Sequence, residues 1–211
     1  MLLLTLIKGV AVGIVIALPV GPVGVLCVRR NLFEGARFGL VSGLGAATAD
    51  AVFAVVAGFG LTFVRDWLLR YEDWLGAVGG LFLLAIGLKA LFIRHPPEPE
   101  PLGGEALLGA YASTFALTIA NPITILSFAA IFAELGLNAV VGWIDVSTLV
   151  AGVFLGSSLW WLGLSLGVTA LRKFARTFQL VWLNRISGSI LSLSGAGLLT
   201  VAIVGLLRAA V

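Results

Sequence analysis

The chain has too few cysteines and histidines for the chemistry that these residues usually carry. Its single cysteine, Cys27, excludes an internal disulfide and a dithiol redox pair. Its single histidine, His95, stands in a proline-rich stretch. A zinc site needs a cluster of such ligands. The sequence therefore predicts no metal site, and a membrane electron carrier that works through a cysteine pair is excluded.

Charge is also scarce. Only 11% of the residues are charged and 60% are hydrophobic, whereas soluble domains carry roughly 25% charged residues. Such a chain cannot cover itself with polar surface in water, so we place it in a lipid bilayer. Its net charge is +3 and its basic residues are scattered, which does not favour nucleic acid as a partner.

Long apolar runs dominate what remains. Spanning about 30 Å of hydrocarbon takes roughly 20 helical residues, and six segments are long enough. They are residues 4–28, 38–64, 74–93, 106–133, 146–171 and 185–207. Lys8 interrupts the first run, so we interpret the N-terminus as part of a span and not as a cleavable signal.

A proline-rich linker at residues 94–105 divides one transmembrane domain, residues 1–211, into two halves. Four prolines between residues 96 and 101 prevent a helix there. The first half, 1–93, and the second, 106–211, therefore each hold three predicted spans. The fold class predicted is an all-α integral membrane protein.

Basic residues are distributed unequally between the two ends of these spans. Nine lie on one side: Arg29, Arg30, Arg37, Lys89, Arg94, Arg172, Lys173, Arg176 and Arg185. Four lie on the other: Lys8, Arg65, Arg70 and Arg208. Because cytoplasmic loops are rich in Lys and Arg, we predict a multi-pass protein of the bacterial inner membrane with both termini outside.

The two halves resemble each other in sequence. With small changes of offset, motifs of the first half align in order with motifs of the second: residues 21–26 with 121–126, Gly43 with Gly152, Trp74-Leu75 with Trp182-Leu183, Gly80 with Gly188, and Gly87 with Gly195. With three spans in each half, the second copy enters the membrane from the opposite side. The pattern predicts inverted repeats, which are common in secondary transporters.

Prolines interrupt the first and the fourth predicted spans. Pro19 and Pro22 flank Gly21 in the first, and Asn121-Pro122 stands in the fourth. A proline removes a backbone donor and bends or breaks a helix. Irregular backbone at membrane depth must be shielded from lipid, so these breaks predict a site that binds a substrate or an ion. A simple kink that serves packing is the alternative.

Polar residues lie on one helix face before the second break. Thr114, Thr118 and Asn121 follow the spacing i, i+4 and i+7, which puts them on one side of a helix. We predict that Thr118 and Asn121 contact the substrate or the ion. The alternative is that the hydroxyls bond back to their own helix and the amide links two helices.

Asp50 is the only charged residue between Phe38 and Val64. Glycines at 35, 39 and 43 precede it at spacings that keep all four positions on one helix face, and such glycines allow close helix contact. Asp50 should therefore face the bundle. It could take up a proton or hold a substrate ammonium, or it could pair structurally with Arg29 or Arg30.

Other glycine faces are predicted to pack helices. Gly152 and Gly156, and then Gly163 and Gly167, make two such faces in the fifth span. A third, Gly76-x3-Gly80, could mediate a homodimer or could pack within one chain.

Taken together, these motifs resemble those of the LysE/RhtB family of amino-acid exporters. They are Gly21-Pro22, then Gly35-x3-Gly39-x3-Gly43-x6-Asp50, then Asn121-Pro122. The resemblance covers almost the whole chain. It implies a transporter, without a cofactor and not an enzyme, that exports amino acids or related small metabolites along an ion gradient. By the resemblance, the functional positions are Gly21, Pro22, Asp50, Asn121 and Pro122.

One departure affects the choice of substrate. Many members of that family have lysine after Asn-Pro, and here the position is Ile123. We therefore expect a small zwitterion, such as an amino acid, and a coupling proton or other ion, without naming the amino acid. The alternatives are a divalent metal-ion exporter, which would need several converging acids, and a channel or scaffold.

Overall fold

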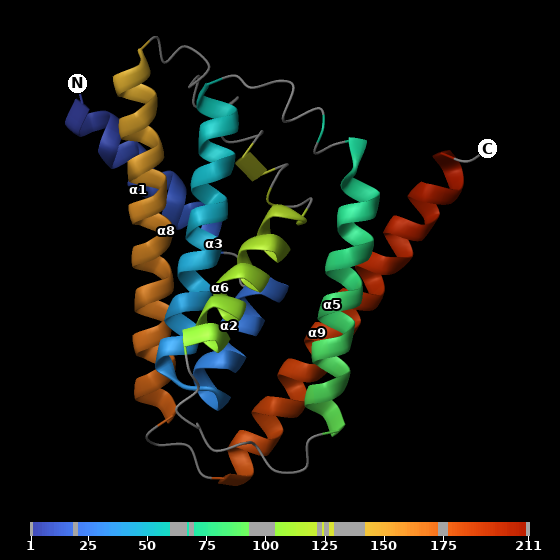
Figure 1. Cartoon of the computed structure of the whole chain (residues 1–211). Helices are drawn as coiled ribbons and strands as arrows, with labels where there is room; N and C mark the ends of the chain where they lie inside the picture. The colour runs from blue at the N-terminus through green and yellow to red at the C-terminus, as the bar shows by residue number, and fades with distance from the viewer. Residues whose placement is uncertain are drawn as a thin grey trace.

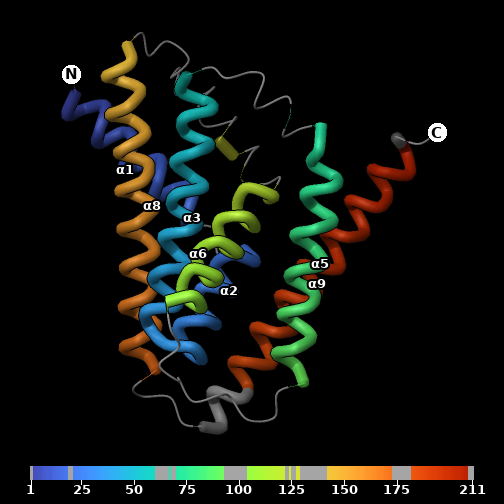
Figure 2. The backbone as a smooth tube through the Cα atoms, viewed as in Figure 1, coloured from blue at the N-terminus to red at the C-terminus, as the bar shows by residue number. Residues whose placement is uncertain are grey.

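A computed structural model of the chain describes residues 2–18, 21–59, 67, 70–92, 104–121, 124, 127–128, 142–172 and 177–209. The regular structure of these residues is helical. The helices are α1 (Leu2–Ala17), α2 (Pro22–Phe33), α3 (Ala36–Gly58), α5 (Glu72–Phe92), α6 (Gly104–Ile119), α8 (Trp143–Arg172) and α9 (Thr177–Ala209). In Figures 1 and 2, α1, α3, α6 and α8 form one group, and α5 and α9 cross each other beside it.

Four of these helices are long and apolar enough to cross a membrane. They are α3, α5, α8 and the Trp182–Arg208 part of α9, and α1 and α2 together would make a fifth span. The predicted count of six is not reached within the described residues. The reason is that the predicted span 106–133 is described chiefly as α6, which ends at Ile119. The proline-rich residues 93–103 lie outside the described part.

The first apolar segment is interrupted near its prolines. α1 ends at Ala17, α2 begins at Pro22, and the two helices are bent by 82°. Proline fits the first position of a helix because the first N–H groups of a helix have no partner within it. Gly21 is the cap residue of α2. Pro19 lies outside the described residues.

Gly35 forms the turn between α2 and α3. Its N–H donates to the Arg30 carbonyl at 3.0 Å, and its φ of 108° lies in the left-handed region that favours glycine. The prediction that Gly35 shares a helix face with Gly39, Gly43 and Asp50 is therefore wrong for Gly35, because α3 begins only after it. Gly39 and Gly43 do lie in α3 and are buried.

Glycines let α1 and α8 cross closely, as predicted for Gly152 and Gly156. A Cβ on Gly152 would stand 2.8 Å from the Cα atom of Gly9 in α1, and a Cβ on Gly156 would collide with the Val10 carbonyl oxygen. The matching prediction for Gly163 and Gly167 is wrong, because no atom lies within 4 Å of a Cβ built there. The reason is that α1 ends and turns away by 82° before it reaches that part of α8.

α5 and α9 also cross through glycines. A Cβ on Gly80 would meet the Gly195 carbonyl oxygen at 2.9 Å, and a Cβ on Gly87 would meet that of Gly188 at 2.8 Å. The face that begins at Gly76 is thus covered within the chain, since Gly76 contacts Ala202 of α9. This face supports packing within one chain and gives no support to a homodimer.

Candidate functional site

A polar cavity lies at the break between α1 and α2. Its volume is about 60 Å³, and its walls come from the end of α1, the start of α2, α3, the end of α6 and α8. We call it the Asp50 cavity. Its polar lining consists of Asp50, Thr118, Asn121, Thr124 and Trp161. The structure thus brings together residues that are up to 111 positions apart in the chain, because the end of α6 and the middle of α8 both face the break.

Asp50 is enclosed by the helices. It is only 3% exposed, and its Oδ2 accepts a hydrogen bond of 2.7 Å from the Ser157 hydroxyl of α8. Close helix packing at Gly43, where a Cβ would meet the Trp161 side chain at 2.5 Å, holds α3 against α8 at this level. A hydroxyl partner donates one hydrogen bond but brings no opposite charge.

Arg30 does not pair with Asp50. Its guanidinium donates to the hydroxyls of Ser42 at 3.0 Å and Thr114 at 2.7 Å, and to the Ala110 carbonyl at 2.8 Å. These bonds link α2 to α3 and α6, and they satisfy a buried charge with neutral acceptors.

Arg29 has different partners. Its Nε donates to the Asn184 side chain at 3.3 Å, and its guanidinium lies 3.7 Å from the Glu34 carboxylate. The alternative in which Asp50 is a structural partner of Arg29 or Arg30 is therefore not what the structure shows.

The predicted polar face of α6 divides between two environments. Thr118 lines the Asp50 cavity, whereas Thr114 accepts the Arg30 bond. Each hydroxyl also donates to the carbonyl four residues earlier, at 2.9 Å, as the alternative interpretation expected. Because each hydroxyl has already donated its hydrogen, it can take part in further hydrogen bonds only as an acceptor.

Asn121 lies at the end of α6 and lines the cavity. Its N–H donates to the Thr118 carbonyl at 3.2 Å, a three-residue turn, and its own carbonyl accepts from Thr124 at 3.1 Å. The helix therefore ends at Ile119, and a turn at Ala120 and Asn121 follows it before the proline. Pro122 itself lies outside the described residues. Gly21 lines the same cavity, and Pro22 lines a neighbouring one.

Sequence reasoning missed Ser157, and for Trp161 it favoured simple packing over a hydrophobic gate or a cation–π wall. Ser157 follows the Gly152-x3-Gly156 motif, which marks the packed face of α8. The offset between the halves instead aligned Asp50 with Leu159, which is 55% exposed. A search for polar residues next to a glycine motif would have found Ser157.

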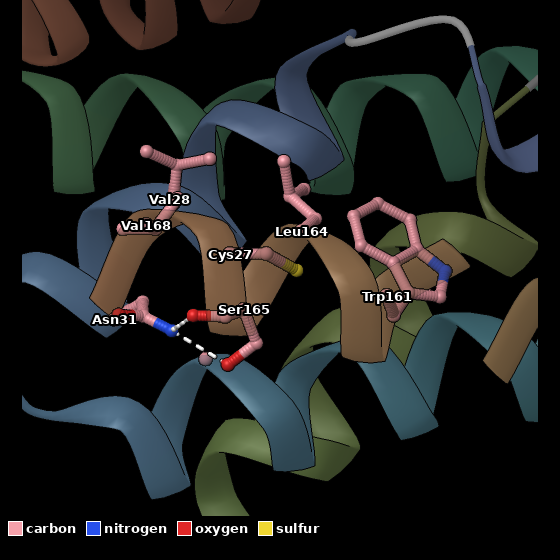
Figure 3. Close-up of a pocket in the computed structure, with 8 residues that line it drawn as sticks. Cys27, Val28, Asn31, Trp161, Leu164, Ser165 and Val168 are labelled. Carbon is pink, nitrogen blue, oxygen red and sulfur yellow. Dashed lines mark hydrogen bonds between the residues drawn. The ribbon is translucent and has the colours of Figure 1, made fainter. Parts of the chain in front are cut away.

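Trp161 is 6% exposed, and its indole N–H has no hydrogen-bond partner among the described residues. The side chain stands between the Asp50 cavity and a pocket of about 10 Å³, too small for more than one water. Figure 3 shows this pocket, with the indole nitrogen on the side away from Cys27 and Ser165. The Asn31 amide there donates to the Ser165 hydroxyl at 2.6 Å, so the polar groups of the small pocket bond each other.

The Asp50 cavity therefore combines an anionic acceptor, a strong neutral donor, and amide and hydroxyl groups. Helix ends add to this set. The last carbonyls of a helix and its first N–H groups have no partner within the helix, and α1 ends and α2 begins at the cavity. Such an arrangement can accommodate both a positive and a negative group of one small molecule.

Comparisons with known proteins indicate the family to which the chain is similar. The family described as "LysE type translocator" matches residues 14–201. The Bacillus subtilis (strain 168) protein named "Putative amino acid efflux protein YcgF" is 24% identical over 191 residues, covering 88% of this chain and 90% of that protein. The Escherichia coli (strain K12) protein named "Uncharacterized membrane protein YahN" is 27% identical over 169 residues, covering 78% and 75%. No solved structure matches the chain.

Proposed function

Because the chain belongs to the LysE type translocator family, we propose that it exports an amino acid or a related small metabolite across the bacterial inner membrane, driven by an ion gradient. The family consists of transporters, so the chain is a transporter and not an enzyme. The observation that carries the proposal is the Asp50 cavity, which places one carboxylate at a break between helices. The "amino acid efflux" in the name of the Bacillus subtilis relative supports the same class of substrate.

In this proposal Asp50 receives the substrate ammonium, or a coupling proton in its place. Among the described residues its hydrogen-bond partner is the Ser157 hydroxyl, which is neutral, so a positive group in the cavity would supply the opposite charge. The carbonyls at the end of α1 would add acceptors for the ammonium, since the C-terminal end of a helix carries partial negative charge.

The substrate carboxylate would face the opposite set of groups. The Trp161 indole N–H is a donor without a partner, and the first N–H groups of α2 lie on the same cavity. A carboxylate is stabilised by such donors and by the positive end of a helix. Asn121 and Thr118, which also line the cavity, would hold the substrate between the two charged ends.

The two halves would act as inverted repeats that rock against each other. Under the offsets found in the sequence, Gly80 corresponds to Gly188 and Gly87 to Gly195. The contacts are crosswise, Gly80 with Gly195 and Gly87 with Gly188. A two-fold axis between the halves predicts such a pair, because it converts one contact into the other.

The contacts between whole helices support the same two-fold axis. α1 of the first half packs on α8 of the second, and α6 of the second packs on α3 of the first. α3 and α8 contact each other, as do α5 and α9. Exchanging the halves turns the α1–α8 pair into the α6–α3 pair, and it turns the α3–α8 and α5–α9 pairs into themselves. A substrate site at the crossing of two such repeats is typical of secondary transporters.

Replacing Asp50 by asparagine tests the proposal. Asparagine has nearly the same size and its oxygen still accepts the Ser157 bond, but it cannot hold an ammonium or a proton as a carboxylate does. We expect efflux from proteoliposomes loaded with labelled amino acids to fall about a hundredfold. Efflux of each labelled amino acid is measured with and without a pH gradient across the vesicle membrane, which shows whether transport is coupled to protons.

Asp145→Asn is the matched control, since Asp145 lies at the start of α8 and outside the cavity lining. It should transport as the unchanged protein does. Normal efflux by a folded Asp50→Asn variant would remove Asp50 from the mechanism. The absence of any amino-acid signal in the unchanged protein would refute the proposed substrate class.

Export of a divalent metal ion is less well supported. In the part of the chain that the structure describes, no group of three or more His, Cys, Asp or Glu side chains gathers. Divalent cations prefer several converging oxygen ligands. The same vesicles, loaded with divalent metals, would reveal such an activity directly.

A further inference from the structure

A larger cavity adjoins the Asp50 cavity. Its volume is about 310 Å³, and Val23 and Asn121 line both cavities. The Asp50 cavity is lined by helices around the first break, whereas the larger one extends between α2, α6, α5 and α9. A molecule anchored beside Asp50 would therefore have one direction in which a side chain of some size can extend.

The walls of the larger cavity are almost entirely apolar. Its lining includes Leu83 and Gly79 of α5, Leu117 of α6 and Leu198 of α9, and besides Asn121 only Ser194 is polar. Among the residues that the structure describes, no charged side chain lines it. Burying a charged group there without a partner would cost several kcal/mol.

We propose that this cavity receives the side chain of the exported amino acid, and that the substrates are amino acids with a large apolar side chain, such as leucine or phenylalanine. The inference rests on the proposed function and adds the class of amino acid. The Asp50 cavity, at about 60 Å³, holds the ammonium and carboxylate ends. The larger cavity reaches the lower end of the range for small-molecule sites, roughly 300–1,000 Å³.

Asn121 marks the boundary between the two parts of this site. It lines both cavities and lies just beyond the end of α6. An amide at that point contacts the polar end of the substrate, while Leu117, one helical turn earlier, contacts the apolar end. The lining thus changes from polar to apolar along one helix end, which matches the change from the charged end to the side chain of an apolar amino acid.

Filling the larger cavity tests the inference. Ser194→Leu adds bulk from the α9 wall. Gly79→Ala adds one methyl group, for which there is room, because its Cβ would meet Leu117 at 3.4 Å and Ala120 at 3.7 Å. We expect Ser194→Leu to lower leucine and phenylalanine efflux about tenfold or more while glycine and alanine efflux stay within about twofold. Gly79→Ala should shift the same preference less.

The matched controls are Gly197→Leu and Gly197→Ala on α9, where no atom lies within 4 Å of an added Cβ. Both should keep the original preference. Retained glycine efflux also shows that each variant is folded and inserted. An unchanged ratio of leucine to glycine efflux in folded Ser194→Leu would overturn the inference.

Two further results separate this inference from the proposed function. Export limited to charged or small polar amino acids would overturn the apolar subsite while the exporter proposal stands. Equal loss of glycine and leucine efflux in Ser194→Leu, with Gly197→Leu normal, would show that the cavity serves the transport movement or holds a lipid chain, and would also overturn the subsite. Absence of all amino-acid efflux in the unchanged protein would refute both proposals.

Discussion

The partner of Asp50 is a hydroxyl group, and this determines how the residue can act. A hydrogen bond from serine contributes about 1 kcal/mol, whereas placing a carboxylate at the centre of a membrane helix costs about 2.5–3.5 kcal/mol on insertion scales. Ser157, at 2.7 Å, therefore orients the carboxylate without compensating fully for its burial. A bound ammonium or a proton would supply the difference.

Trp161 offers a second test at the level of one residue. Its indole N–H has no partner and its side chain lines the Asp50 cavity. Trp161→Phe keeps an aromatic ring but removes this donor. Because a hydrogen bond to a charged group contributes about 1.5–3 kcal/mol, we expect the KM for amino-acid efflux to rise about tenfold or more, with little change in kcat.

Trp160→Phe is an unusually close control for that experiment. Trp160 is the neighbouring residue, and its indole N–H also has no partner, but it does not line the Asp50 cavity. Its variant should keep the KM of the unchanged protein. Equal effects of the two substitutions would show that the indole N–H of Trp161 does not contact the substrate.

At the level of helices, glycines determine where α1 and α8 meet. A Cβ on Gly156 would collide with the Val10 carbonyl oxygen, and one on Gly13 would collide with that of Val153. Backbone atoms cannot move aside as flexible side chains do. The crossing therefore positions Ser157, the residue after Gly156, where α3 brings Asp50.

Gly156→Ala should force α1 and α8 apart where they cross. We expect the free energy of unfolding in detergent to fall by about 1–3 kcal/mol, the usual cost of overpacking. Gly163→Ala on the same helix has open space around its Cβ and should leave stability unchanged or raise it by up to about 1 kcal/mol. Similar values for the two variants would show that the close crossing does not stabilise the fold.

The sequence predicted the helices and the main glycine contacts because both depend on spacing along one chain. The pattern Gly152-x3-Gly156 identified a contact face, and the α1–α2 break lies among Pro19 to Pro22. The spacing could not show which helix packs against a given glycine face. Gly163 and Gly167 have the same spacing as Gly152 and Gly156, yet a Cβ built on either would meet no atom of the described residues within 4 Å, since α1 has already ended.

The candidate site was predicted in part for the same reason. Asp50, Thr118, Asn121 and Gly21 do line one cavity, because each is marked by its own local sequence. Ser157 was not found, since a serine in an apolar helix carries no signal by itself. The glycine motif beside it marks its face of α8, but its pairing with Asp50, 107 residues away in the chain and 2.7 Å away in space, comes from the crossing of α3 and α8.

At the level of the whole molecule, the described basic residues gather at the two ends of the bundle. Lys89 and Arg172 lie in the last turns of α5 and α8, and Arg185 lies near the start of α9. In Figure 1 these three helix ends lie at the same end of the molecule, and both termini lie towards the other end. The arrangement of the helices thus agrees with the counting of charges, while the side that faces the cytoplasm is still a prediction.

A reporter at the C-terminus decides the orientation. The nine basic residues on one side against four on the other favour that side as cytoplasmic, so the C-terminus should lie outside. Alkaline phosphatase, which folds only outside the cytoplasm, should then be active when fused after Val211, and a green fluorescent reporter that folds only inside should be dark there.

The same two reporters fused after Arg172, at the end of α8, should give the opposite pair of results. If the fusions after Val211 and Arg172 both gave reversed signals, the larger set of basic residues would face the outside. That outcome would contradict the predicted orientation but not the proposed two-fold relation between the halves, because an inverted repeat has the same architecture from either side.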